Sequence, residues 1–363
     1  MPGGSKTWSK LRWGCAGGCF GLVVIAIILV IATIWFLLGS VPVVPEETFL
    51  LPEATAFAVV RIEPDDTLMA ELPFRVASHP EVREELRKQD VDPRKLEGNV
   101  AKARENVRKM APVQMVALLM PPEEEEGEFS AAAAFSMRRY SRLIRMLLRG
   151  GKEGETSEYK EAAIVAPADE PLLAVRGNNF MRAERMETLH TWVDRLVEQR
   201  ARQEAAAEGE TPRPELELRP RLREAYERMD RSLPVRFACL NESGELAHLA
   251  ERIEREEVLE ALEAIGALGD GVAMLSGSLE PLNETDAELS LRWDCRDDEH
   301  AAGLEAGFRR MTAEMPAGRH LRDVRLDRPE PSVFRLRVRI ADFADFVARA
   351  GAAGGEDATP PSP

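Results

Sequence analysis

The sequence predicts an α+β protein: an N-terminal transmembrane helix followed by a duplicated two-layer domain, in which helices cover one face of an antiparallel sheet. Three observations lead to this prediction. Residues 15–38 form an apolar run without a charged residue. The rest of the chain alternates short strand-like runs with amphipathic helical segments. The order of these segments in residues 53–206 recurs in residues 218–350, as expected for a duplicated domain.

The apolar run at residues 15–38 is long enough to cross a bilayer. A helix of this length reaches about 36 Å, whereas a hydrocarbon core is about 30 Å thick. Residues 1–14 carry Lys6, Lys10 and Arg12 and no acid. The positive-inside rule therefore predicts a cytoplasmic tail at 1–14, a single-pass anchor in the cell inner membrane and a periplasmic body. A cleaved signal peptide is the alternative, but its apolar region is typically about 7–15 residues long.

Glycines at the start of the apolar run indicate a contact between helices. Gly14 and Gly18, and likewise Gly17 and Gly21, form two overlapping GxxxG spacings. This spacing lets two transmembrane helices approach closely, so a second copy of the chain or another membrane protein is a candidate partner beside the lipid bilayer. The alternative is that small residues are simply common in such helices.

The first half of the exported body, residues 53–206, follows a proline-rich linker at 39–52. Its strands are rich in β-branched or apolar residues, its hairpins surround the acidic loop PPEEEEGE and the turn PADEP, and its helices carry apolar stripes. The expected order is strand, helix, hairpin, helix, hairpin and helix, at residues 55–62, 96–110, 113–137, 140–148, 159–176 and 181–206.

The second half, residues 218–350, follows a linker at 207–217 that has two prolines and no apolar periodicity. The same criteria predict the same element order, at residues 235–240, 246–265, 272–293, 304–315, 321–340 and from 343 onward. The tail at 351–363 is rich in Gly and Pro, which predicts disorder.

Two strands of the second half indicate how the layers stack. Apolar residues alternate with Arg335, Arg337 and Arg339 in residues 332–340, and apolar and polar residues alternate in the same way in residues 286–294. Because successive side chains of a strand point to opposite faces, one face of this sheet is expected to be covered and the other to face water.

Composition and motifs exclude several function classes. The chain has 363 residues and a net charge of −15, which argues against nucleic acid or an anionic membrane surface as a partner. The sequence contains no GxSxG, HExxH, Walker or Rossmann motif and no CxxC pair. Its five histidines are scattered and are interpreted as surface residues. We therefore expect no enzymatic activity, no metal and no cofactor.

Two groups of residues are candidate sites. Arg335, Arg337 and Arg339 share one strand face and could bind an anionic polymer such as a phosphorylated or uronic-acid glycan. The alternative is that they form ion pairs with acids on neighbouring strands. Cys239 and Cys295 could form a disulfide in an oxidising compartment, and the alternative is that they are two buried free thiols.

The segment Leu51-Pro52-Glu53-Ala54-Thr55, which leads into AFAVVRI, resembles the opening of uncharacterised bacterial single-pass membrane proteins. In those proteins an LPxxT segment precedes a large, often duplicated α+β exported domain. The resemblance implies the same layout here and no catalytic residues.

The sequence thus predicts a membrane-anchored extracytoplasmic protein that acts as a non-enzymatic structural or interaction module of the cell envelope. Two alternatives stay open. One is a ligand-binding domain that uses the groove between the two halves, and the other is an exported hydrolase whose site is not recognised in the sequence.

Overall fold

The computed structural model describes residues 43–63, 67–80, 82–83, 112–122, 128–137, 155–166, 171–206, 213–250, 262, 266–314 and 320–352. They fall into two compact units, each discontinuous in the sequence. Unit A contains the described residues of Ile34–Asp66 and Asn106–Cys239, and unit B contains those of Thr67–Glu105 and Leu240–Pro363. This division differs from the predicted halves 53–206 and 218–350, because a strand of the second half pairs with the first strand of the chain.

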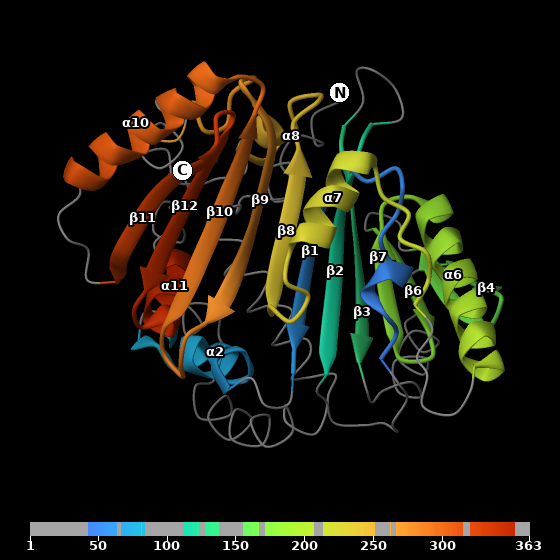
Figure 1. Ribbon diagram of the computed structural model, residues 1–363. Coiled ribbons are helices and arrows are strands. Elements are labelled where there is room, and N and C mark those ends of the chain that lie inside the picture. The colour runs from blue at the N-terminus through green and yellow to red at the C-terminus, as the bar shows by residue number, and fades with distance from the viewer. Residues whose placement is uncertain are drawn as a thin grey trace, which may run out of the picture. The chain divides into compact units, whose positions relative to one another are not determined.

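The described strands of unit A form an antiparallel sheet in the order β4-β5-β6-β7-β3-β2-β1-β8 (Figure 1). Their bounds are Ala56–Ile62 for β1, Val113–Met120 for β2, Ser130–Met137 for β3, Glu155–Tyr159 for β4, Ala162–Ala166 for β5, Leu172–Arg176 for β6, Asn179–Ala183 for β7 and Val235–Leu240 for β8. Strand β1 lies between β2 and β8 and pairs with both. Strands β2 and β3 are the predicted hairpin at 113–137.

Helices α6 (Met186–Ala205) and α7 (Pro220–Arg228) and the short 3-10 helix η1 (Glu46–Thr48) belong to unit A. Helix α6 packs on β6, β7 and η1, and Figure 1 shows α6 and α7 in front of this sheet. Trp192 of α6 and Tyr226 of α7 are fully buried. Their rings meet Phe49 and Phe57 edge-on, at centroid distances of 6.1 and 5.7 Å. The first contact packs α6 against the segment after η1, and the second packs α7 against β1 of the sheet.

The predicted linker at 39–52 is in part a buried segment of unit A. Phe49, Leu50 and Leu51 are 0–1 % exposed. The indole Nε1 of Trp192 donates a hydrogen bond to the carbonyl of Phe49 at 2.8 Å. The prolines that favoured a linker flank this segment and do not keep it out of the core.

Two tight turns change the predicted boundaries in unit A. Lys160 and Glu161 have φ values of 45° and 66° and form a turn. The strand expected at 159–166 is therefore interrupted: β4 ends at Tyr159, and β5 begins at Ala162. Gly177, at φ 58°, and Asn178 connect β6 to β7, so residues 179–183 form a strand and the helix expected at 181–206 begins at Met186. Positive φ at central turn residues matches the twist of a two-residue hairpin.

The described strands of unit B form an antiparallel sheet in the order β9-β10-β12-β11. Their bounds are Val272–Pro281 for β9, Ala287–Cys295 for β10, Leu321–Glu330 for β11 and Val333–Ile340 for β12, and the helices are α2 (Thr67–Ser78), α8 (Glu245–Ala250), α10 (Asp298–Glu314) and α11 (Phe343–Ala352). The hairpins expected at 272–293 and 321–340 are present. Strand β11 continues through most of the expected turn, with register shifts on either side of Asp323 and Pro329. Proline cannot donate to a ladder, which suits this edge strand.

Helix α10 covers one face of the sheet of unit B, where it packs on β10, β11 and β12. The rings of Trp293, Phe308 and Phe334 lie 5.2–5.4 Å apart between these layers. Helix α2 packs against α11. His79, just after α2, and His320 both contact the carboxylate of Asp345, at 2.8 and 3.0 Å. These contacts link the end of α2 to α11, the last helix of the chain that the structure describes.

The contrast between one covered face and one wet face is weak in β2 of unit A. Val116 and Leu118 are buried on one face of β2, and Ala117 and Leu119 are half-buried on the other. The expected alternation was taken from two strands of unit B, and β2 of unit A has apolar residues on both faces.

Several predictions lie outside the described residues: the cytoplasmic tail at 1–14, the transmembrane helix at 15–38, the glycine spacings and the tail from residue 353 onward. Among the helices that the structure describes, none combines the length and the apolar character needed to cross a membrane.

Candidate functional site

Six arginines share the face of the unit B sheet that is turned away from α10. The strand register sets three of them on β12, one on β10 and two on β11. We call this group the arginine face: Arg292, Arg322, Arg325, Arg335, Arg337 and Arg339. It contains the three arginines predicted from the sequence and three that the sequence reasoning missed.

The register sets arginine opposite arginine in three cross-strand pairs. Arg335 of β12 lies opposite Arg292 of β10. Arg337 lies opposite Arg325 of β11, and Arg339 lies opposite Arg322. Directly opposed like charges destabilise a sheet. This arrangement is therefore not what packing of the sheet alone would favour.

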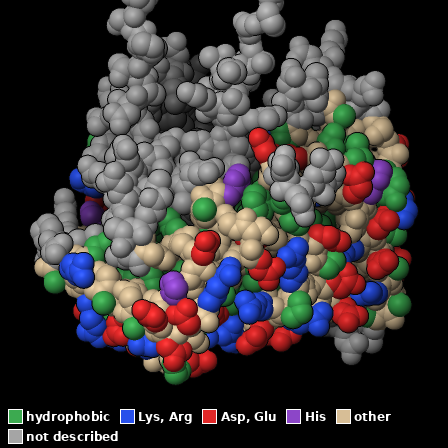
Figure 2. Space-filling model, turned by 90° about the horizontal axis from the view of Figure 1, so that it is seen from above, with side chains coloured by type: hydrophobic (Ala, Val, Ile, Leu, Met, Phe, Trp, Pro, Cys, Tyr) green, Lys and Arg blue, Asp and Glu red, His purple; other side chains and the backbone are tan. Residues whose placement is uncertain are grey.

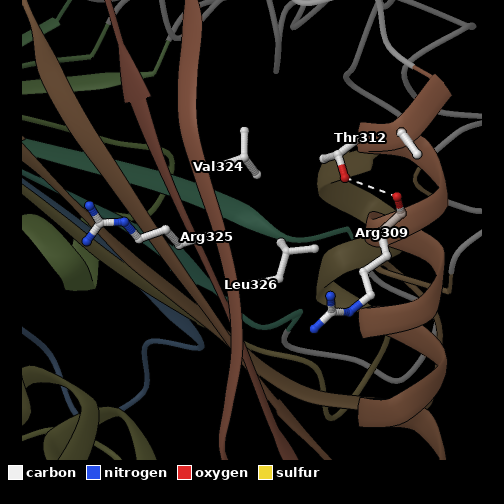
Figure 3. Close-up of a pocket in the computed structure, with 6 residues that line it drawn as sticks. Arg309, Thr312, Val324, Arg325 and Leu326 are labelled. Carbon is white, nitrogen blue, oxygen red and sulfur yellow. Dashed lines mark hydrogen bonds between the residues drawn. The ribbon is translucent and has the colours of Figure 1, made fainter.

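Figure 3 shows how β11 separates its two faces. Val324 and Leu326 are directed toward α10, where Arg309 and Thr312 line an open pocket, while Arg325 points to the opposite side of the strand. The hydroxyl of Thr312 already donates a hydrogen bond within α10, to the carbonyl of Arg309 at 3.1 Å. The guanidinium of Arg325 thus points away from this pocket, although Arg325 is also one of the residues that line it.

Two of the six arginines are neutralised by neighbouring carboxylates. The Nη2 of Arg339 donates to Asp286 at 2.6 Å, and this bond, with help from the backbone N–H of Asp342, lowers the pKa of the Asp286 carboxyl to about 2. Arg292 donates to Asp294 at 2.8 Å and lies 3.4 Å from Glu330. These two residues form ion pairs of the kind that the sequence analysis gave as the alternative for Arg335, Arg337 and Arg339.

The remaining four arginines have no hydrogen bond or ion pair within the part of the chain that the structure describes: Arg322, Arg325, Arg335 and Arg337. Arg322 and Arg325 are exposed, and Arg335 and Arg337 are half-buried. Asp327 lies opposite Arg335 in the register but is not within ion-pair distance. Ion pairs with acids on neighbouring strands therefore do not account for these four arginines.

Neighbouring strands are about 4.8 Å apart, and residues i and i+2 of one strand are about 6.8 Å apart. Arg325, Arg335 and Arg337 thus lie in adjacent positions of one lattice. Each guanidinium offers a planar fork of donors that fits a carboxylate or a phosphate in a bidentate manner. The arrangement can bind several anionic groups at once.

Sequence reasoning found Arg335, Arg337 and Arg339 from their alternation within one strand. It missed Arg292 because that residue lies among acids in its own strand, and it missed Arg322 and Arg325 because they are three residues apart. The irregular backbone at Asp323, with φ 50°, brings both of them to the same face. The pattern of charges on β10 and β11 could have been found only by aligning the three strands.

The two cysteines for which the sequence left a disulfide or two buried free thiols open are free in the structure. Cys239 of β8 and Cys295 of β10 are both buried and both reduced. Burial, together with the nearby carboxylates of Asp294 and Asp297, raises the pKa of the Cys295 thiol to about 11. A thiol of this kind is mostly protonated at neutral pH, so it is a poor nucleophile.

A second cluster of charges lies in the core of unit A. Arg236, fully buried on β8, donates to both carboxylate oxygens of Glu46 at 2.6 and 2.8 Å. The hydroxyl of Tyr226 donates to Glu46 at 2.5 Å, and Arg231 donates to Glu47 at 3.0 Å. Burial raises the pKa of Tyr226, and both glutamates raise it further. This cluster holds the segment after residue 43 in place and lies away from solvent, so we interpret it as structural.

Within the described ranges, no group of three or more His, Cys, Asp or Glu residues is arranged to hold a metal ion. The side of the molecule seen in Figure 2 carries acidic and basic side chains in an interspersed arrangement. The excess of acid over base is therefore not collected into one patch on that side.

The fold defines a mixed α/β protein built on antiparallel sheet, with helices packed on it. No model of a known protein family matches the chain, and no curated protein matches it. One solved structure, described as crystal form I of TP0453, shares 10 % sequence identity with a TM-score of 0.42, over 86 % of this chain and 98 % of that one.

Proposed function

We propose that this protein is a membrane-anchored extracytoplasmic interaction module without enzymatic activity, and that it binds an anionic partner through the arginine face. The apolar run at 15–38 is the anchor, with the N-terminus in the cytoplasm. The body lies on the other side of the membrane. Its sheet supplies the binding surface.

The observation that carries the proposal is the set of opposed arginine pairs with four guanidinium groups that no described acid neutralises. Two of the opposed pairs contain an arginine with a carboxylate partner, Arg292 or Arg339, whereas Arg325 and Arg337 oppose each other with no such partner, which costs stability in the free protein. The chain has a net charge of −15, so acidic residues are abundant in it. An acid opposite each arginine would have avoided the repulsion. A bound polyanion removes the repulsion and makes several charge-assisted hydrogen bonds at the same time, which accounts for the arrangement.

The buried segment after the proposed anchor supports a body held close to the membrane. The backbone N–H of Val44 donates to Ser136 at 3.1 Å, and the side chain of Gln114 donates to the carbonyl of Val44 at 3.3 Å. The chain from residue 38 to residue 44 spans at most about 20 Å. The anchor and unit A are therefore joined by a short connection and not by a long flexible tether.

We also propose that the body arose by duplication. In unit A, β7 pairs with β3, the outer strand of the hairpin β2–β3, and helix α6 follows β7. In unit B, β12 pairs with β10, the outer strand of the hairpin β9–β10, and helix α11 follows β12. The same strand pairing occurs twice in the same chain order.

The binding proposal is tested with the full chain in detergent micelles and fluorescently labelled inorganic polyphosphate. We expect the triple variant R325Q/R335Q/R337Q to weaken binding at least tenfold at constant ionic strength. The control triple R200Q/R309Q/R310Q removes the same charge from α6 and α10, and we expect it to change the dissociation constant less than twofold. Equal losses in the two triples would mean that net charge alone governs binding, and the arginine face would not be the site.

A further inference from the structure

Serine hydroxyls continue the rows of the arginine face toward β9. Ser290 of β10 lies opposite Arg337 on one side and opposite Ser278 of β9 on the other. Arg292 lies opposite Ser276 in the next row. Read across the strands from β11, one row is therefore Arg325, Arg337, Ser290 and Ser278.

Two of these hydroxyls are available to a ligand. Ser278 and Ser290 are half-buried, and neither hydroxyl makes a hydrogen bond within the described residues, whereas Ser276 is buried. Four adjacent strands span about 14 Å. Within that width the face changes from guanidinium donors on β11 and β12 to hydroxyl groups on β10 and β9. A ligand that fits it carries anionic groups at one end and hydroxyl groups at the other.

Other anionic partners fit this face less well. Nucleic acids bound as single strands need aromatic side chains on which bases can stack. The residues that the register sets on this face include no aromatic ring: Met274, Ser276, Ser278, Glu280, Glu288, Ser290, Arg292, Asp294, Val333, Arg335, Arg337, Arg339, Arg322, Arg325, Asp327 and Glu330. Simple polyanions such as polyphosphate carry no hydroxyl groups, so they can only accept hydrogen bonds from the serines and cannot donate to them.

We propose, on the basis of the function proposed above, that the partner is an acidic glycan, whose carboxylate or phosphate groups bind the arginines while its hydroxyl groups bind Ser278 and Ser290. The glycan lies across the strands. Its anionic groups meet Arg325, Arg335 and Arg337 in bidentate contacts. Its sugar hydroxyls exchange hydrogen bonds with the serine side chains.

The test uses the full chain in detergent micelles and four probes at one ionic strength: oligogalacturonate, its methyl-esterified form, phosphorylated dextran, and polyphosphate with the same number of charges as the oligogalacturonate. We expect oligogalacturonate or phosphorylated dextran to bind at least tenfold more tightly than polyphosphate. The tighter of the two identifies the anionic group. The methyl ester keeps the hydroxyls but not the charge, and we expect it to lose at least tenfold in affinity.

The variant S278A/S290A separates the hydroxyl contribution from the charge contribution. We expect it to weaken binding of the acidic glycan about fivefold and to change polyphosphate binding less than twofold. Ser157→Ala, at an exposed position of β4, is the control and should change neither. If glycan and polyphosphate bind equally well and the serine variant alters neither, the glycan class is wrong while anion binding stands. If no anionic probe binds the wild-type chain, the proposed function itself is wrong.

Discussion

The carboxylate of Asp286 shows how a single residue links the charge of the sheet to stability. It accepts hydrogen bonds from Arg339 at 2.6 Å and from the hydroxyl of Thr285 at 3.0 Å. The pKa of Asp286 is about 2 in the folded chain, whereas an unperturbed aspartate has a pKa of about 3.9. A carboxyl whose pKa is lowered by folding stabilises the folded state above its unfolded pKa, and this contribution is lost as the pH falls through the folded value.

We therefore expect Asp286→Asn to lower the urea midpoint of unfolding at pH 7, because the variant keeps the shape of the side chain but loses its charge. The difference in urea midpoint between wild type and variant should become smaller as the pH falls from about 4 to about 2. Asp323→Asn is the control, because Asp323 is exposed and lies 4.0 Å from Arg339. If this difference in urea midpoint is the same at pH 7 and at pH 2, the ionised Asp286 does not stabilise the folded state in the way proposed.

A different residue-scale effect governs the buried pair Glu46 and Arg236. Removing one partner of a buried ion pair leaves an uncompensated charge, which costs about 3–5 kcal/mol, whereas replacing both with apolar residues is often nearly neutral. We expect E46L and R236M each to lower the free energy of unfolding by about this amount. The double variant E46L/R236M should lose much less free energy of unfolding than the sum of the losses in the two single variants. A double-mutant cycle from urea unfolding measures this coupling, and strictly additive losses would exclude it.

At the scale of elements, the contact between α2 and α11 depends on one carboxylate. Asp345 accepts hydrogen bonds from His79 at 2.8 Å and from Arg349 at 2.9 Å, and His320 lies 3.0 Å from its second oxygen. Burial alone would raise the pKa of Asp345, but the hydrogen bonds from His79 and Arg349 outweigh that effect and lower it. The residue is therefore ionised at neutral pH.

We expect Asp345→Asn to loosen α2 because it weakens three bonds at once. Amide hydrogen exchange at pH 7 should become about tenfold faster in Thr67–Ser78, with little change in α6 of unit A. Asp298→Asn, in the first turn of α10, provides a control at an aspartate that does not contact α2. Unchanged protection of α2 in the Asp345 variant would show that apolar packing alone holds the two helices together.

At the scale of the whole molecule, the main prediction concerns the membrane. A helix of residues 15–38 should keep the full chain in the membrane fraction after an alkaline carbonate wash, because about 20 apolar residues suffice to span the bilayer. Deletion of residues 1–38 should release the body into the soluble fraction. A mature wild-type chain that begins near residue 40 and is found free of membranes would identify a cleaved signal peptide instead.

The helices and strands were predicted best where a regular apolar period continues over many residues. The hairpins at 272–293 and 321–340 and the helix that contains Leu304 and Phe308 are of this kind. The predictions failed at short turns, such as Lys160–Glu161, which lack the glycine or asparagine that usually marks positive φ. They also failed at residues 46–51, where prolines and glutamates indicated a linker although the segment is buried.

The sequence by itself determined which residues form most strands, which side chains share a face and where an apolar anchor is expected, because these properties follow from local periodicity. Only the tertiary structure decided that arginine lies opposite arginine on β10, β11 and β12, and that Glu46 meets Arg236 over a separation of 190 residues. Register and long-range pairing depend on how the whole chain packs. Local periodicity does not contain that information.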